Sequence, residues 1–276
     1  MSNKIDPVAL RKRTLIMGII NLTEDSFHAP SRTGLDKILE TAADMVNAGA
    51  DILDIGAEST RPGADRVSEP LELERIEAAV KIIRKHFPEV LLSIDTTRAS
   101  VAKAALEQGA DIINDVSGIS DSEMLKVVKQ FDAGLVLMHS RGTPKTMDSL
   151  CLYDDLIGDM ISFFNTKITE ITSYGIDDSN IIIDVGLGFA KTAEQDLFIL
   201  KNLDTFKALG YPLLIGASRK RFIGAALGEP DPANRLEGTL AVSALCADQG
   251  VAILRVHDVL ENYRAVKMIA AIKKGQ

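Results

Sequence analysis

One short strand and the turn after it set the pattern for this chain: Leu213-Leu214-Ile215-Gly216-Ala217-Ser218-Arg219-Lys220. The apolar run predicts a buried strand that stops at Gly216, and a helix is expected soon after the turn. Backbone N–H groups at a helix start, together with a hydroxyl and two cations, favour an anionic, oxygen-rich ligand. Because the same turn could simply carry two solvated cations, its meaning depends on how the other strands end.

Short apolar runs of this kind recur along the chain and alternate with amphipathic segments. Continuous apolar runs are typical of parallel strands covered on both faces, and the amphipathic segments are typical of the helices that cover them. We expect eight strands, at residues 14–20, 51–55, 90–94, 111–113, 134–138, 180–183, 213–215 and 251–254.

Eight βα units in 276 residues predict an α/β fold, a single-domain (β/α)8 TIM barrel. The domain is expected to span residues 1–276, with residues 1–13 as an N-terminal lead-in. An open, doubly wound sheet is the alternative, although such a sheet has no particular reason to stop at eight strands. A weak internal repeat favours the barrel, since Gly49–Asp54 resembles Gly109–Asn114 and a fainter copy begins at Gly175.

The connections between the expected elements differ in length. Those from helix to strand are very short, whereas those from strand to helix are long. Long loops at one end of a compact domain are usually functional, and in a barrel that end is the C-terminal face. The long loops are expected at residues 21–34, 56–69, 139–153, 186–191 and 216–234.

The composition excludes several classes of protein. Apolar residues make up 46% and charged residues 25%, as in ordinary soluble globular proteins. The net charge of −8 argues against nucleic acid or an anionic membrane as a partner. Cys151 and Cys246 form no paired framework, which fits a reducing compartment. We expect a cytoplasmic protein, because the polar residues 1–13 lack the apolar segment of a signal peptide and no run approaches the ~20 residues of a membrane span.

Polar residues stand at the ends of nearly all the expected strands, and a barrel would bring them together at one mouth. Asp95, Asn114 and Asp184 should line its base, with the cations on one side. A carboxylate and an amide suit the amide and amino edges of a flat heterocycle. The residues concerned are Asn21, Asp54, Glu58, Thr60, Arg61, Asp95, Asn114, Asp115, Met138, His139, Asp184, Ser218, Arg219, Lys220, Arg255, His257 and Asp258.

The remaining groups suit the other parts of such a ligand. Met138 offers a soft apolar face to a ring, and Lys220, Arg255 and His257 suit a phosphate or pyrophosphate. Asn21, a neutral oxygen ligand, suits a Mg²⁺ ion held mainly by water and substrate phosphates. Each residue also has an ordinary structural use, such as capping a helix, so the joint pattern carries the interpretation.

At this point the chain resembles the dihydropteroate synthase family over nearly its whole length. Seven motifs in order are far more specific than any one of them. They are MGIINLTEDSF (residues 17–27), DIGAESTRPGA (54–64), SIDT (93–96), IND (113–115), IDVGLGF (183–189), GASRK (216–220) and RVHD (255–258).

The resemblance implies a transferase of folate biosynthesis. Such an enzyme joins p-aminobenzoate to 6-hydroxymethyl-7,8-dihydropterin pyrophosphate, giving 7,8-dihydropteroate and pyrophosphate. It also implies Mg²⁺ as cofactor, a homodimer, and a pocket that binds sulfonamides as mimics of p-aminobenzoate.

The resemblance also implies roles for individual residues. The catalytic set would be Asn21, Asp95, Asp184, Lys220, Arg255 and His257. The pterin would be bound by Asp95, Asn114, Met138, Asp184, Lys220 and Arg255. The pyrophosphate would be bound by Asn21, Thr60, Arg255 and His257, with Asn21 as the metal ligand. The p-aminobenzoate pocket would comprise Phe27, Thr60, Arg61, Pro62, Phe189, Ser218 and Lys220, with Ser218 at a helix N-terminus facing the carboxylate.

The chemistry of the leaving group favours a dissociative, SN1-like substitution. Negative charge develops on the bridging oxygen as the C–O bond breaks, and Mg²⁺, Arg255 and His257 suit that charge. The electron-rich dihydropterin can share the positive charge on its exocyclic carbon, which Asp95 and Asp184 would favour. The amine would then attack from the opposite side, so no enzyme nucleophile is needed.

The first loop departs from the family pattern. After Phe27 the family commonly continues with Ser-Asp-Gly-Gly, whereas here the sequence is His28-Ala29-Pro30-Ser31-Arg32-Thr33-Gly34, and Glu24 replaces a common Pro. The change concerns loop closure and the contacts to p-aminobenzoate, but not the residues at the base of the mouth.

Two other functions remain as alternatives. A pterin-dependent methyltransferase domain shares the barrel and the acids, but it would not need the pyrophosphate-binding set. A non-catalytic pterin-binding paralogue would fit the altered first loop, and Mg²⁺-dependent turnover would exclude it.

Overall fold

The computed structural model describes residues 13–22, 32–58 and 67–275, without the side chains of residues 32 and 33. The described strands form a closed parallel barrel in the order β1 to β8, so the predicted (β/α)8 barrel is confirmed. The strands are β1 (Leu15–Asn21), β2 (Ile52–Gly56), β3 (Leu91–Asp95), β4 (Ile112–Asp115), β5 (Gly134–Met138), β6 (Ile181–Asp184), β7 (Leu213–Ile215) and β8 (Ile253–Val256).

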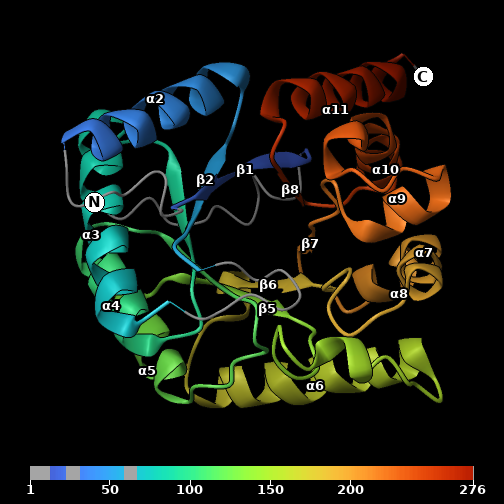
Figure 1. Cartoon of the computed structure of the whole chain (residues 1–276). Helices are drawn as coiled ribbons and strands as arrows, with labels where there is room; N and C mark the ends of the chain where they lie inside the picture. The colour runs from blue at the N-terminus through green and yellow to red at the C-terminus, as the bar shows by residue number, and fades with distance from the viewer. Residues whose placement is uncertain (1–12, 23–31, 59–66, 276) are drawn as a thin grey trace.

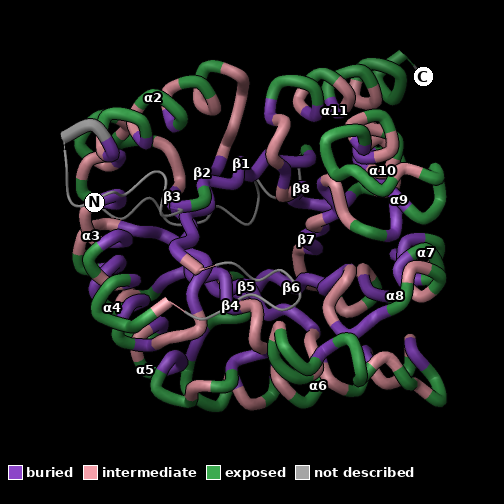
Figure 2. Tube along the Cα trace, in the orientation of Figure 1, coloured by how far each residue is buried: buried purple, intermediate pink, exposed green. Residues whose placement is uncertain are grey.

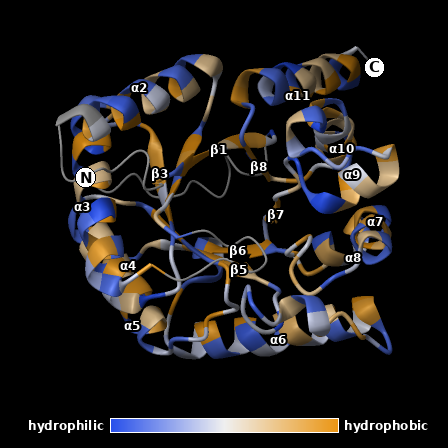
Figure 3. Cartoon of the chain, viewed as in Figure 1, coloured by the Kyte–Doolittle hydropathy of each residue, from blue (hydrophilic) through white to orange (hydrophobic). Residues whose placement is uncertain are grey.

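Helices surround the barrel, and in Figure 1 they form a ring about the strands. Figures 2 and 3 show that the strands are buried and largely apolar, whereas the helices expose a polar outer side. The α-helices of the described residues are α2 (Arg32–Ala48), α3 (Glu69–His86), α4 (Ala99–Glu107), α5 (Glu123–Phe131), α6 (Leu156–Ser173), α7 (Ala193–Lys201), α8 (Leu203–Lys207), α9 (Arg221–Leu227), α10 (Leu236–Asp248) and α11 (Val259–Lys274).

Alternation along each strand divides the side chains between two cores. Successive side chains of a strand point to opposite faces. One face packs against the helices in a large apolar cluster, and the other fills the barrel with a second cluster that includes Ile52, Ile112, Ile182 and Ile253. Two residues further along the same strands, the inward side chain is polar, and these residues are Asp54, Asn114, Asp184 and Arg255.

The internal repeat has a physical basis in the barrel. Gly49 and Gly109 end their helices with φ of 102° and 96°, in the left-handed region that glycine adopts most readily. In both copies the following Asp accepts a backbone N–H from the preceding strand: Asp51 from Ile16 at 2.9 Å and Asp111 from Leu92 at 2.8 Å. The repeat therefore ties each helix end to the strand before it.

The predicted bounds were wrong in two respects that matter for the site. First, several strands run one or two residues further than expected, so Asn21, Asp95, Asn114, Asp184 and Arg255 lie within strands rather than after them. Second, two loops are shorter than expected. Helix α2 begins at residue 32 within the expected loop 21–34, and α9 lies inside the expected loop 216–234, where Phe222 and Ile223 are buried in the apolar core.

No helix in the described ranges has the length and apolar character needed to cross a bilayer.

Candidate active site

The ends of β2, β3, β4, β6 and β8 carry a group of polar side chains that we call the polar layer. It consists of Asp54, Ser93, Asp95, Asn114, Asp184 and Arg255. Along each strand, a member of the layer lies two residues after an inward-facing apolar side chain or after another member. The layer therefore lies directly above the apolar core inside the barrel. The strand register also brings Met138 of β5 beside Asp184 of β6, where Met138 is buried.

Arg255 links two carboxylates across the mouth. Its Nε donates to Asp54 Oδ2 at 2.6 Å and its Nη2 donates to Asp95 Oδ2 at 2.7 Å. Asp54, which is completely buried, also accepts a bond from Ser93 Oγ at 2.6 Å and longer ones from Asn114 Nδ2 at 3.3 and 3.4 Å. This network fixes the guanidinium and both carboxylates before any ligand arrives.

Burial and neighbouring charges shift the pKa values of this network in opposite directions. Burial favours the neutral form of Arg255, but the carboxylates of Asp54 and Asp95 outweigh it and raise the pKa of the guanidinium. Burial raises the pKa of Asp95 to about 7, although the Arg255 charge opposes the shift. One cation therefore serves two carboxylates, and the layer keeps an excess of negative charge that suits a cationic or donor-rich ligand.

The layer also offers acceptors to a ligand. Among the described residues, Asn114 Oδ1 and Asp115 Oδ2 are buried and have no hydrogen-bond partner. Buried polar atoms in native proteins are nearly always bonded, and an exception calls for an explanation such as a bound group. Asn114 lies in the layer itself, so its free acceptor can take an N–H from a ligand at the mouth.

Asp184, a member of the layer, and Lys220 attract each other electrostatically. Asp184 Oδ1 accepts the N–H of Gly186 at 2.8 Å, and Lys220 Nζ donates to the carbonyl of Leu187. The same ammonium lies 4.6 Å from the ring centroid of Phe189. Burial lowers the pKa of Lys220 to about 8, with Asp184 opposing the shift, and burial raises the pKa of Asp184.

Ser218 does not stand at a helix N-terminus, contrary to the sequence prediction. Helix α9 begins at Arg221 and Lys220 is its N-cap, because residues 217–220 form a turn closed by Lys220 N–H to Ala217 O at 3.2 Å. Instead, Ser218 Oγ lies 2.9 Å from His257 Nδ1 and accepts the backbone N–H of His257 at 3.2 Å. Ser218 therefore fixes the orientation of the His257 ring.

The two cations of the GASRK motif also separate. Arg219 turns to Asp258 with two bonds, from Nε at 2.8 Å and from Nη2 at 2.6 Å, and its backbone is left-handed with φ of 58°. Lys220 faces Leu187 and Phe189, as described above. Only Lys220 of the two is thus directed at the group of residues predicted to bind the ligand.

The remaining predicted residues divide into two groups. Asn21 is the exposed last residue of β1, opposite Gly56 of β2. Phe27, Thr60, Arg61 and Pro62 lie outside the described residues, as do Glu24 and the altered segment 28–31 of the first loop.

The sequence places Asp54 and His139 at the mouth without giving either a role. A lone Asp inside an apolar strand, such as Asp54, is the signal that would have marked it as an inward charge. Lys191 and Asp196 were not considered. His139 is buried, and burial lowers its pKa to about 2, so it is neutral.

Known proteins match this chain closely. Residues 17–257 match the family described as pterin binding enzyme. A dihydropteroate synthase of Synechocystis is 47% identical over 250 residues, which cover 90% of this chain and 86% of the relative. Among solved structures, the Yersinia pestis dihydropteroate synthase superposes with a TM-score of 0.90 at 36% identity, covering 98% of this chain and 96% of that one. The Clostridium difficile enzyme has a TM-score of 0.87 at 42% identity, with coverage of 95% and 97%.

These matches extend over the strands that carry the polar layer as well as over the helices around them. The chain therefore belongs to the dihydropteroate synthase family of pterin-binding enzymes, which are transferases of folate synthesis.

Proposed function

We propose that this chain joins p-aminobenzoate to 6-hydroxymethyl-7,8-dihydropterin pyrophosphate, releasing pyrophosphate and forming 7,8-dihydropteroate. The observation that carries the proposal is the polar layer, in which buried carboxylates and an unpartnered amide oxygen face a fixed guanidinium. The amino and amide N–H groups of a pterin match such acceptors. The relatives support the choice of substrates, since the Clostridium difficile enzyme was solved in the presence of pteroic acid and the Yersinia pestis enzyme with a sulfonamide drug complex.

The roles proposed for the layer follow from its chemistry. Asp184, Asp95 and Asn114 would hold the pterin edge, with Met138 and Arg255 against its faces. Their negative charge would favour the cationic ring that forms as the C–O bond breaks, and Arg255 and His257 would stabilise the departing pyrophosphate. The amine nitrogen of p-aminobenzoate then bonds to the exocyclic carbon and loses a proton. Positional exchange of ¹⁸O within unreacted substrate, without p-aminobenzoate, is the expected sign of this dissociative route.

Asn21 would hold Mg²⁺ in this proposal. Its exposed side chain at the end of β1 is a neutral oxygen donor, and Mg²⁺ keeps most of its water and is often bound by few protein ligands. In the described part of the chain no cluster of three or more acidic, His or Cys side chains competes for the ion. When bound, Mg²⁺ supplies positive charge to the pyrophosphate. Turnover should disappear with a chelator and return with added Mg²⁺.

We expect a narrow, bell-shaped pH dependence of kcat/KM for the pterin substrate. Asp95 must be ionised to accept two N–H bonds, and its pKa of about 7 means that protonation lowers kcat/KM as the pH falls below that value. Lys220 must be protonated to donate, and its pKa of about 8 means that kcat/KM falls again at higher pH. The measurement is initial rates at low pterin concentration in a series of buffers.

The variant Lys220→Arg tests the upper limb of this profile. Arginine stays charged at every pH used, so the variant should lose the fall above about pH 8 even if it is slower. A wild-type profile that is flat from about pH 6 to 9 would contradict both assignments.

The experiment that tests the proposed function measures pyrophosphate release with Mg²⁺, with and without p-aminobenzoate, together with dihydropteroate. Release that is coupled to product would support the synthase. Tight pterin binding without product that depends on p-aminobenzoate would instead favour the non-catalytic paralogue or the methyltransferase, and the altered first loop would become the main clue.

We also propose that the chain forms a homodimer. Helix α7 packs against α9 and α9 against α10, and each of these three helices exposes large apolar side chains. Grouped exposed apolar residues often mark a protein interface. The residues are Leu197, Phe198, Leu227 and Leu245. Light scattering after size-exclusion chromatography should give twice the mass of the chain.

A further inference from the structure

A buried lysine stands between two loops at the mouth of the barrel. Lys191 is only 4% exposed, and its Nζ lies 2.9 Å from the carbonyl of Gly186 and 3.0 Å from that of Phe189. It also lies 3.3 Å from the carbonyl of His139 and 3.0 Å from His139 Nδ1. The ammonium thus ties the end of β5 to both ends of the loop after β6, which we call the β6–α7 loop (residues 185–191).

The backbone of the β6–α7 loop needs such support. Gly186, Gly188 and Ala190 have φ of 63°, 74° and 50°, and a left-handed conformation is unfavourable for alanine. A Cβ added to Gly186 would lie 2.1 Å from the carbonyl oxygen of His139, which shows how closely the loop approaches β5. An unsupported loop of this shape would have several conformations of similar energy.

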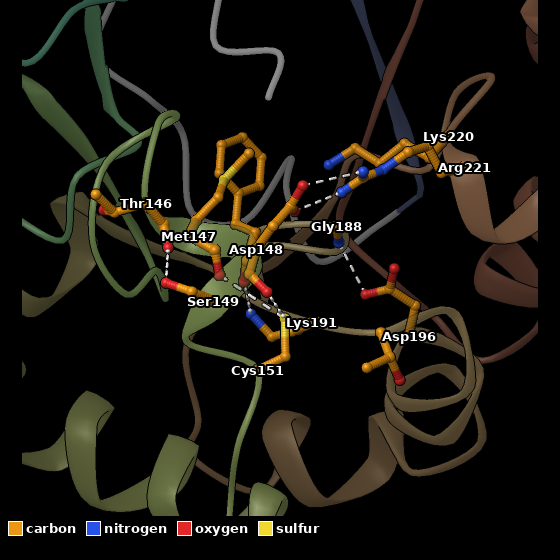
Figure 4. A network of polar contacts seen from close by, with 12 residues as sticks. Thr146, Met147, Asp148, Ser149, Cys151, Gly188, Lys191, Asp196, Lys220 and Arg221 are labelled. Atoms are coloured by element: carbon orange, nitrogen blue, oxygen red, sulfur yellow. Dashed lines mark hydrogen bonds and ion pairs between the residues drawn. The ribbon is translucent and has the colours of Figure 1, made fainter. Parts of the chain in front are cut away.

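Side chains at both ends hold the loop in addition to Lys191. Asp184 accepts the N–H of Gly186 at 2.8 Å, Asp196 Oδ1 accepts that of Gly188 at 2.8 Å, and Tyr153 Oη donates to Ala190 O at 3.0 Å. Figure 4 shows Lys191 with Gly188 and Asp196 beside it and Lys220 above. The loop is therefore determined by contacts from β6, α7 and the segment before α6.

The segment that Lys191 holds is the one that contacts Lys220. Lys220 Nζ donates to Leu187 O and lies 4.6 Å from the centroid of the Phe189 ring. Both groups belong to residues 186–189, and Lys191 binds the carbonyls at the two ends of this stretch, those of Gly186 and Phe189. Any shift of the loop would move the carbonyl and the ring together, and Lys220 with them.

Retaining a charge at this position is costly. Burial lowers the pKa of Lys191 to about 7, with Asp196 opposing the shift. An apolar side chain of similar size would avoid this penalty, but it would leave the carbonyls of His139, Gly186 and Phe189 without the donor that Lys191 supplies. The use of a lysine here is therefore to bond carbonyls of two separate loops.

We propose that Lys191 is a positioning residue for the arylamine half of the site, holding the β6–α7 loop so that Phe189 and Lys220 form the p-aminobenzoate pocket. This inference rests on the proposed function and adds a residue to it. The pterin half should depend much less on Lys191, because every residue predicted to bind the pterin except Lys220 belongs to a barrel strand.

The test compares Lys191→Met with Lys201→Met. Both remove one ammonium from the same region, but Lys201 is exposed at the end of α7 and should have no effect. For Lys191→Met we expect KM for p-aminobenzoate to rise about tenfold or more. Its Kd for the pterin pyrophosphate, measured by calorimetry, should change less than about threefold. A residue that only stabilises the fold would lower the melting temperature without separating the two substrates.

A milder variant covers the case in which Lys191→Met does not fold. Tyr153→Phe removes only the bond to the Ala190 carbonyl, and it should raise KM for p-aminobenzoate about threefold with unchanged pterin affinity. Equal losses for both substrates, or no loss for either, would overturn the proposal while leaving the proposed function intact. A wild-type chain that binds pterin but makes no dihydropteroate would overturn both.

Discussion

Replacing Arg255 by Met is expected to reduce both turnover and folding stability. The guanidinium is the cation that Asp54 and Asp95 share, and both carboxylates are buried. Removing one partner of a buried ion pair costs about 3–5 kcal/mol, because the other is left without compensation. The loss of a fixed cation next to the leaving group should lower kcat/KM by about 100- to 1,000-fold. Chemical denaturation and steady-state kinetics measure the two effects separately.

Two further variants separate the charge effect from a general loss of packing. Adding Asp54→Asn to the Arg255 variant removes one unpaired charge, so stability should recover in part while activity stays low. Arg84→Met is the matched control, because Arg84 bonds Asp111 at the opposite end of the barrel with both side chains largely buried. It should lose stability while the folded protein keeps its kcat/KM. An Arg255→Met protein as stable as the wild type would contradict the role given to the ion-pair network.

Replacing Asp184 by Asn is expected to abolish most pterin binding while leaving the fold intact. The amide oxygen can still accept the N–H of Gly186, so the start of the β6–α7 loop should keep its conformation. Burial raises the pKa of Asp184, which means that the folded chain gains little from its charge, and stability should change by no more than about 1 kcal/mol. The charge is instead needed to bind the pterin edge, so the Kd for the pterin pyrophosphate should rise about 100-fold or more.

Calorimetric titration with the pterin pyrophosphate measures this loss without requiring turnover. Asp178→Asn is the matched control, because Asp178 precedes the same strand at the opposite end of the barrel, where its carboxylate accepts a solvent-exposed bond from the Tyr211 hydroxyl. It should bind pterin like the wild type. Unchanged pterin affinity in the Asp184 variant would rule out the proposed orientation of the substrate.

The fold could be predicted well from the sequence, and the reason lies in local patterns. Buried parallel strands must be apolar on both faces, and covering helices must be amphipathic, so each element was visible in its own residues. The errors were in the bounds. A strand end that carries Asp184 or Arg255 looks like a loop, because a charge in a buried strand makes sense only when its partner is known.

The site was predictable as a list of residues but not as a set of contacts. Motifs placed Asp95, Asn114 and Arg255 at strand ends, and the barrel brings them together. Arg255 pairs with Asp54, which is 201 positions away, and no pattern among neighbouring residues indicates this pairing. The same holds for Lys191, whose partner His139, directly after β5, is 52 positions away.

The barrel, the end of it that carries the site and the family to which the chain belongs can all be inferred from the sequence alone, because periodicity and motif order are properties of neighbouring residues. Which charges pair depends instead on the three-dimensional fold. Arg219 and Lys220 are adjacent in the chain and equal in charge, yet one bonds Asp258 and the other reaches Leu187 and Phe189. That difference arises because closing the barrel sets the direction of each side chain, and buried charges are stable only where opposite charges or carbonyls meet them.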